Sequence, residues 1–112
     1  MLKIDIQQLQ NNLVLIALEG PLDNTTISAF EQSIEPLLKG KQGLTLILDL
    51  SRLNYINSTG IARFLQYYLH LKSSNGRLRI FGVPDFIGEI LDICGASKIL
   101  DIYTTREEAL PG

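Results

Sequence analysis

The 112-residue sequence contains one cysteine, Cys94, and one histidine, His70. A single cysteine cannot form an intramolecular disulfide, so no disulfide framework is expected. No cysteine or acidic cluster stands at ligand spacing from the histidine, and the pattern therefore indicates no metal site. A cytoplasmic location is the default for a chain of this kind.

Long apolar stretches and excess positive charge are also missing. No apolar run approaches the roughly 20 residues that span a bilayer. The N-terminus carries an acid, Asp5, and lacks the long apolar segment of a signal peptide. The net charge is −2, and no basic stripe is present. These absences argue against membrane insertion and against nucleic acid as a partner.

Signatures of cofactor sites and of catalysis are absent as well. The sequence has no Walker motif, no dinucleotide fingerprint and no CxxC pair. Cys94 falls on an apolar helix face without a base partner, so we interpret it as a small core residue. We expect no cofactor and no catalytic residue, which disfavours a small enzyme of the flavodoxin or thioredoxin type.

What the sequence does contain is typical of one packed α/β domain. Hydrophobic residues make up 46% and charged residues 20%, which fits a single domain over residues 1–112. Strands 3–9 and 13–18 should form an antiparallel hairpin. A first helix should follow, with Ile27, Phe30 and Ile34 on one face, and Pro36 should kink it or end it near residue 34 or 35. The remaining expected elements are a strand at 44–50, a helix at 61–72, a strand at 77–81, a helix ending at Gly95, a strand at 99–103 and a short helix behind a capping box at 105–108.

The chain is organised around residues 44–72. Residues 44–50 are nearly all apolar, which predicts a strand buried on both faces in a parallel sheet. Residues 61–72 have helical periodicity. Their predicted inner face is formed by Ile61, Phe64, Leu65, Tyr68, Leu69 and Lys72.

Three small polar residues and a glycine connect this strand to this helix: Asn57, Ser58, Thr59 and Gly60. Asn, Ser and Thr side chains accept hydrogen bonds from the free N–H groups of a first helical turn. The same turn tolerates an anion, so a hydroxyl here stands where a phosphate would be accommodated. Gly60 leaves room for a close approach. From the local pattern alone, a simple helix cap is the stronger interpretation.

Three stretches resemble the STAS domains, and specifically the bacterial anti-sigma factor antagonists. Residues 49–60, DLSRLNYINSTG, resemble the family signature. Residues 18–23 resemble the family's loop after the second strand, which ends in an aspartate, here Asp23. Residues 90–95 and 102–110 resemble the C-terminal helix, strand and helix of the family. The resemblance implies a single STAS-like α/β domain: a small mixed sheet with helices packed mainly on one face.

The resemblance also implies a function without enzymatic activity. Family antagonists bind an anti-sigma factor that is itself a serine kinase. Phosphorylation of one hydroxyl prevents that binding, and a serine phosphatase restores it. In this sequence the acceptor position falls on Ser58, and Asn57 replaces the aspartate that usually precedes it. Other family members act as constitutive scaffolds or as subunits of sensory or lipid-transport complexes, which is the alternative.

The expected partner-binding set is Asp23, Asn24, Asn57, Ser58, Thr59 and Gly60. Asp23 and Asn24 belong to it because the sheet topology should bring their loop near the start of the Ser58 helix. A cap of the following helix is the alternative role for these two residues.

Overall fold

Five strands form one mixed sheet in the order β1-β2-β3-β4-β5, so strands that follow one another in sequence are neighbours in space. The computed structural model describes residues 1–111. Only β1 and β2 pair antiparallel, as the predicted hairpin, and the later neighbours are parallel. The strands are β1 (Lys3–Gln10), β2 (Leu13–Leu22), β3 (Thr45–Ile56), β4 (Arg77–Phe81) and β5 (Asp101–Tyr103).

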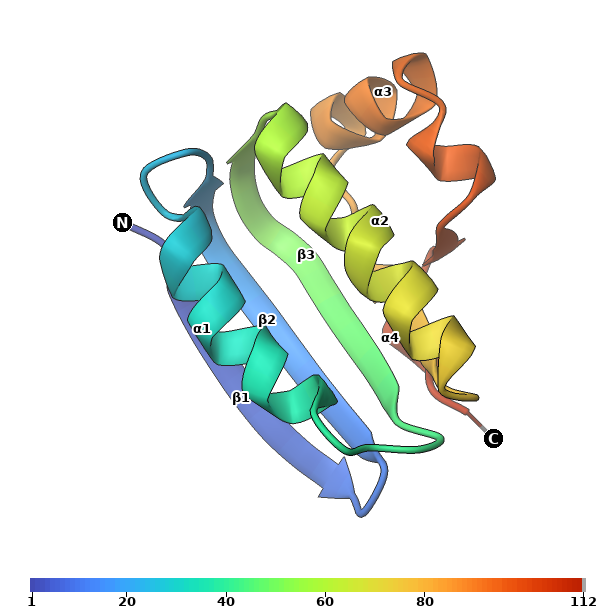
Figure 1. Cartoon of the computed structure of the whole chain (residues 1–112). Coiled ribbons are helices and arrows are strands. Elements are labelled where there is room, and N and C mark those ends of the chain that lie inside the picture. Colours follow the sequence, from blue (N-terminus) through green and yellow to red (C-terminus); the bar gives the residue numbers. More distant parts are fainter. Residues whose placement is uncertain (112) are drawn as a thin grey trace.

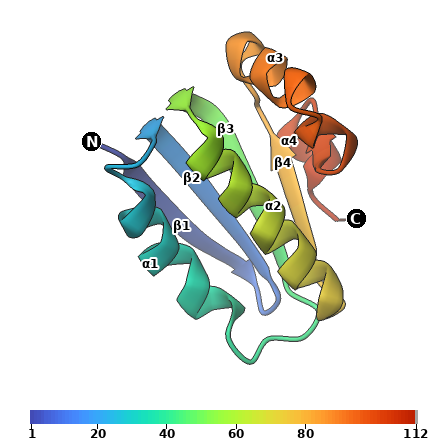
Figure 2. The same ribbon diagram turned by 45° about the horizontal axis from the view of Figure 1, so that its top comes forward.

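The helices lie mainly on one face of this sheet, which confirms the predicted fold class (Figure 1, Figure 2). α1 (Ile27–Leu38), α2 (Ser58–Ser73) and α3 (Asp85–Ile93) contribute buried residues to the large core on that face. A 3-10 turn (Ala96–Lys98) connects α3 to β5. The short α4 (Arg106–Ala109) covers part of the opposite face, behind the predicted capping box of Thr105 and Glu108.

The centre of β3 is buried on both faces, as its continuous apolar sequence predicts. Leu46 and Leu48 belong to the core under α1 and α2, where the Phe30 and Phe64 rings meet edge-on at 5.8 Å between centroids. Ile47 points the other way and packs with Phe81 in the smaller core that α4 covers. This double burial fixes the strand from which the Ser58 helix begins.

β2 and β3 are both longer than predicted. β2 continues through residues 19–22, which were expected to form a loop, and β3 continues to Ile56. Two irregularities in the β2–β3 ladder insert extra β3 residues, one between its pairs at 49 and 52 and one between those at 53 and 55. An inserted residue shifts the in–out alternation of a strand. The buried residues here are therefore three apart: Leu50, Leu53 and Ile56.

Three helical details also differ from the predictions. Pro36 does not end α1, because it lies in the exposed last turn, and the helix runs to Leu38. The buried face of α2 is formed by Gly60, Ile61, Phe64, Tyr67 and Leu71. Leu69 is 60% exposed, so the predicted inner face is rotated by about one residue. Cys94 is exposed at the C-cap of α3 and is not a core residue.

Candidate functional site

The predicted site lies where β3 ends and α2 begins. Asn57 is the only residue between these elements, and its extended backbone (φ −121°, ψ −174°) makes it the N-cap of α2. Its side-chain Oδ1 accepts hydrogen bonds from the backbone N–H groups of Thr59, at 3.1 Å, and Gly60, at 3.4 Å. Two of the free donors of the first turn are thereby satisfied, and the start of the helix is held in one conformation.

Ser58 is the first residue of α2 and its side chain is exposed. Within residues 1–111, no hydrogen bond engages its hydroxyl. The cap on Asn57 therefore fixes the backbone of Ser58 and leaves its Oγ directed to solvent. A hydroxyl in this position is accessible to another protein.

The loop between β2 and α1 is joined to this helix start by Asn24. Its Oδ1 accepts hydrogen bonds from the hydroxyl of Thr59, at 2.7 Å, and from the side-chain amide of Asn57, at 3.2 Å. The predicted proximity of residues 23–24 to the start of the helix is confirmed. Thr59 thus uses its hydroxyl to hold the loop and does not cap α2.

Asp23 shapes the same loop from within. Its carboxylate accepts hydrogen bonds from the hydroxyl and the N–H of Thr25, at 2.7 and 2.9 Å, and from the N–H of Thr26 at 3.2 Å. These bonds, with the Thr25 hydroxyl first, lower the pKa of Asp23 because they favour its charged form. Asp23 thereby presents Asn24 to α2, and it is a turn-forming residue more than a helix cap.

Gly60 is buried, so it offers a partner less surface than any other residue of the predicted set. A Cβ added to it would stand 3.0 Å from side-chain atoms of Leu22 and Ile56, the last residues of β2 and β3. The missing side chain lets the first turn of α2 approach the ends of both strands. The close approach that the sequence suggested is made by the chain's own strands.

Tyr55 was missed by the sequence analysis. It stands next to the last residue of β3, two positions before Asn57, and its side chain is 49% exposed. A regular in–out alternation from Leu53 would bury it, and only the irregular β2–β3 ladder turns it outward. It adds an aromatic surface close in sequence to the Ser58 hydroxyl.

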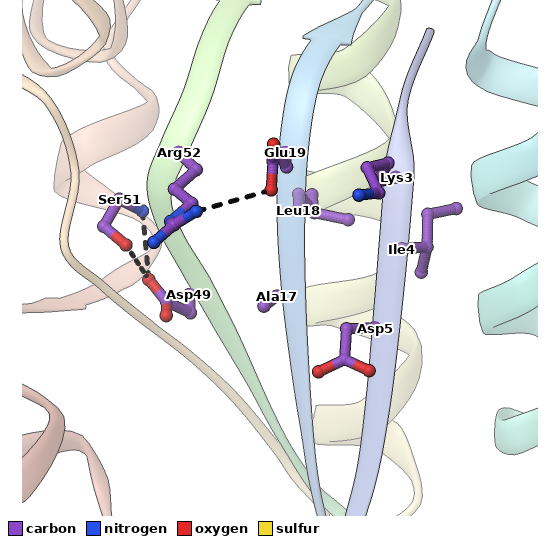
Figure 3. A pocket seen from close by; sticks show the side chains of 9 residues that line it. All are labelled: Lys3, Ile4, Asp5, Ala17, Leu18, Glu19, Asp49, Ser51 and Arg52. Atoms are coloured by element: carbon purple, nitrogen blue, oxygen red, sulfur yellow. Dashed lines mark hydrogen bonds and ion pairs between the residues drawn. The ribbon is translucent and has the colours of Figure 1, made fainter.

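A hollow of about 440 Å³ lies on the same face of the sheet as α4, on the part that this helix does not cover (Figure 3). One row of paired residues across it is Lys3, Glu19 and Arg52, and the next is Asp5, Ala17 and Asp49. Its charges are partly paired within it: Arg52 with Glu19 at 3.7 Å, and Asp49 with the Ser51 hydroxyl at 2.7 Å. Exposed pairs of this kind contribute about 0–1 kcal/mol.

Residues 1–111 contain neither a metal-ligand cluster nor a candidate membrane-spanning helix. No group of three or more His, Cys, Asp or Glu side chains is placed to hold a metal ion. No helix in this range combines the length and the apolar composition needed to cross a bilayer.

This sheet order, with a capped helix starting at an exposed serine, defines a small α/β domain of the STAS type. The family model for the STAS domain matches residues 3–109, and the chain belongs to that family. Among curated relatives, the anti-sigma-B factor antagonist of Listeria monocytogenes is 26% identical over 107 residues, covering 96% of this chain and 93% of the relative.

Solved structures show the same fold. An anti-sigma factor antagonist from Mycobacterium paratuberculosis matches with a TM-score of 0.85 and 19% identity, covering 97% of this chain and 91% of the other. SpoIIAA matches in its unphosphorylated form (TM-score 0.80, 20% identity, coverage 96% and 92%). The phosphorylated form of SpoIIAA from Bacillus also matches (TM-score 0.74, 20% identity, coverage 96% of each chain).

Proposed function

We propose that this chain, a single STAS domain over residues 1–112, is a cytoplasmic anti-sigma factor antagonist without enzymatic activity. It binds an anti-sigma factor serine kinase through the surface of Asn24, Tyr55, Asn57, Ser58 and Thr59. Phosphorylation of Ser58 abolishes this binding, and a serine phosphatase reverses it. The observation that carries the proposal is the exposed, unengaged hydroxyl at the first residue of a capped helix.

The relatives support this proposal because their names describe them as anti-sigma factor antagonists. The Listeria monocytogenes relative is an anti-sigma-B factor antagonist and aligns over nearly the whole chain. SpoIIAA is an anti-sigma factor antagonist whose structure is known with and without phosphorylation, and both forms have the fold of this chain. A phosphoryl group is therefore compatible with the fold in a relative.

Electrostatics explains how one phosphoryl group can act as a switch without refolding. The modification adds about −1.5 to −2 charges at neutral pH. The N-terminus of α2 offsets part of this charge by about 1 kcal/mol, so the antagonist alone tolerates it. In an interface, a phosphate that meets an acidic patch or loses water without gaining partners costs several kcal/mol. A cost of about 2.8 kcal/mol already weakens binding 100-fold.

Asn57 is compatible with this mechanism although the family usually has aspartate there. Its amide oxygen caps α2 as a carboxylate would, while its amide N–H₂ group donates to Asn24, which a carboxylate cannot do. The site therefore keeps its geometry and loses one negative charge. A kinase that approaches Ser58 with ATP meets less repulsion than it would beside an aspartate.

The test is phosphorylation by the cognate anti-sigma factor kinase with ATP, followed by intact-mass analysis. The native chain should gain one phosphoryl group, and Ser58→Ala should gain none. Ser28→Ala is the matched control, because Ser28 is an exposed serine in the first turn of α1. Equal incorporation into Ser58→Ala and the native chain would remove Ser58 as the acceptor.

Partner binding separates the switch from the constitutive alternative. Unmodified chain should capture the kinase on a column, and phosphorylated chain should not. If the kinase is captured equally before and after modification, the chain is a constitutive scaffold. If the native chain and the double variant Tyr55→Ala, Asn24→Ala capture the kinase equally, the interface lies elsewhere.

A further inference from the structure

β1 is a long open edge of the sheet. In the described part of the chain it pairs only with β2, while β5 at the other edge is three residues long. An edge strand directs the N–H and C=O groups of every second residue outward, where another strand can pair with them. Edges are usually protected by lysine, proline or a bulge. Here Lys3 and the bulge at Gln8–Gln10 stand at the two ends, which leaves residues 4–8 open with Asp5 as their one charge.

One exposed apolar side chain stands in the middle of this edge. Ile6 pairs with Ile16 of β2, which in turn pairs with Leu48 of β3. Both partners belong to the core under the helices, so the side chain of Ile6 lies on the helix face of the sheet. It is 43% exposed, since β1 is the outermost strand. A further strand along β1 would cover it.

The charges of α1, the helix above this edge, all face away from it. α1 lies over β1 and β2, with α2 on its inner side (Figure 1). Its two charged residues are Glu31 and Glu35. The first pairs with Arg63 of α2, and the second accepts a hydrogen bond from the Tyr67 hydroxyl at 2.9 Å. The acidic side of α1 is therefore engaged by α2.

The opposite flank of α1, on the side of the β1 edge, has no charge. It carries Ala29, Ser33 and Leu37, which are four residues apart and so form one row along the helix. The Ser33 hydroxyl donates to the carbonyl oxygen of Ala29 at 3.0 Å, so this donor is satisfied within the helix. Small and apolar side chains in a row allow another helix to approach closely.

We propose that β1 and this flank of α1 form the interface of a homodimer. Two copies pair antiparallel along β1, about a two-fold axis perpendicular to the sheet, which joins the two five-stranded sheets into one. Because α1 lies over β1 and β2, the two α1 helices then stand about two strand spacings apart, or about 9.6 Å. Packed helices are about 8–10 Å apart, so the two flanks meet when the strands pair.

Side chains and strand length select one register for this pairing. An axis at Ile6 places the two copies of this residue against each other. It also places Asp5 opposite the partner's Gln7, whose amide can donate to the carboxylate. An axis one residue earlier would oppose two Asp5 carboxylates, which is destabilising. Axes at Ile4 or Gln7 shorten the pairing, the first because the strand begins at Lys3 and the second because of the bulge.

This interface leaves the surface around Ser58 free. The residues of β2 that pair with residues 3–8 end at Glu19, three positions before Leu22, which pairs with the last residue of β3. Ser58 lies beyond that point. The dimer therefore presents two copies of the Ser58 surface, and it does not depend on the function proposed above.

Sedimentation equilibrium of the full chain tests the dimer. At about 100 µM the native chain should show twice its monomer mass of 12.5 kDa, with a dissociation constant of about 10 µM or tighter. Ile6→Lys should be monomeric, because two like charges would meet at the axis. Ile102→Lys is the matched control, because Ile102 is an exposed isoleucine of the other edge strand, and it should dimerise as the native chain does.

Urea unfolding of Ile6→Lys checks that its fold persists. A monomeric native chain at about 100 µM would overturn the proposal and leave the β1 edge to an extended segment of another protein. A dimer that survives Ile6→Lys and is lost in Ile102→Lys would overturn it as well.

Cysteine cross-linking tests the register in a Cys94→Ser background, which removes the native thiol. Directly opposed residues of antiparallel strands have Cα atoms about 4.5–5.5 Å apart, a separation that a disulfide spans. Ile6→Cys should therefore give a covalent dimer on oxidation. Gln8→Cys, two residues along the same strand, should not. Equal cross-linking at both positions would contradict the register, and a failure at Ile6→Cys would contradict the pairing even if Ile6→Lys did not fold.

A charge placed in the flank tests the part of α1. Ala29→Glu should weaken the dimer about tenfold, because it puts carboxylates into an uncharged contact. Gln32→Glu is the matched control, because Gln32 is an exposed residue of the same helix outside the row, and it should leave the dissociation constant unchanged. Equal effects of the two substitutions would show that α1 takes no part in the interface.

Discussion

An added methyl group should have opposite effects on stability at two helical glycines. Gly60 lies in the first turn of α2, and Gly88 lies inside α3. Neither glycine has a positive φ, so alanine fits both backbones without strain. The local change is the same, and the surroundings decide the sign. We therefore predict that Gly88→Ala stabilises the fold and that Gly60→Ala destabilises it.

The magnitudes follow from the space at each site. Alanine is favoured over glycine in a helix interior by about 1 kcal/mol. At Gly88 the nearest atom to a new Cβ is Val83 Cγ1 at 3.7 Å, an ordinary contact, so a gain of about 0.5–1 kcal/mol remains. At Gly60 the Cβ stands 3.0 Å from Leu22 and Ile56, both buried. Overpacking costs about 1–3 kcal/mol, which leaves a net loss of about 1 kcal/mol.

Equilibrium unfolding in urea measures both changes. With an m-value of about 1–2 kcal/mol/M, the two midpoints should separate by roughly 1 M on opposite sides of the native one. The m-values should be unchanged, because neither substitution alters the surface exposed on unfolding. A Gly60→Ala variant as stable as the native chain would show that α2 is free to move away from the strand ends, and the packing argument for this glycine would be wrong.

Three other predictions concern the side chains of Asn24, Tyr67 and Ser58. Asn24→Ala should cost about 1 kcal/mol, because Thr59 and Asn57 lose a shared acceptor; in a urea double-mutant cycle with Thr59→Val, a coupling below about 0.3 kcal/mol would contradict this. Burial and the bond to Glu35 raise the pKa of Tyr67, so above about pH 10 the unfolded chain binds fewer protons and stability falls as pH rises. Urea midpoints of Tyr67→Phe should fall less between about pH 8 and 10.5 than native ones, and parallel curves would refute the coupling. Ser58→Asp should change thermal stability by less than about 1 kcal/mol, because its side chain is exposed at the helix N-terminus, and a larger loss would mean that Ser58 has a structural role.

Features set by local chemistry could be predicted from the sequence. The cap of α2 by the Asn57 side chain and the capping box at Thr105 depend on residues within one turn. The double burial of β3 follows from an uninterrupted apolar run. The contact between the Asn24 loop and the start of α2 was also predictable, because parallel strands bring those ends to one edge of the sheet.

Features set by longer-range packing could not. The inserted residues in β3 change which side chains face the core, and nothing in the local sequence marks them. Tyr55 was missed for this reason. On α2, two apolar stripes offset by one residue compete, and the buried one includes Tyr67, whose hydroxyl reaches Glu35. Of the other stripe, Tyr68 is half-buried at the edge of the core, with Lys72 over its ring, and Leu69 is exposed.

The hydrogen bonds of Asn24 unite two stretches of chain that are 33 residues apart at Asn57. A short synthetic peptide spanning the serine would lack the opposing loop and the helix cap together. An enzyme that recognises the Asn24 loop and the start of α2 together would therefore modify folded domains and would not modify nascent or denatured chains. Modification would then report only on molecules already competent to bind.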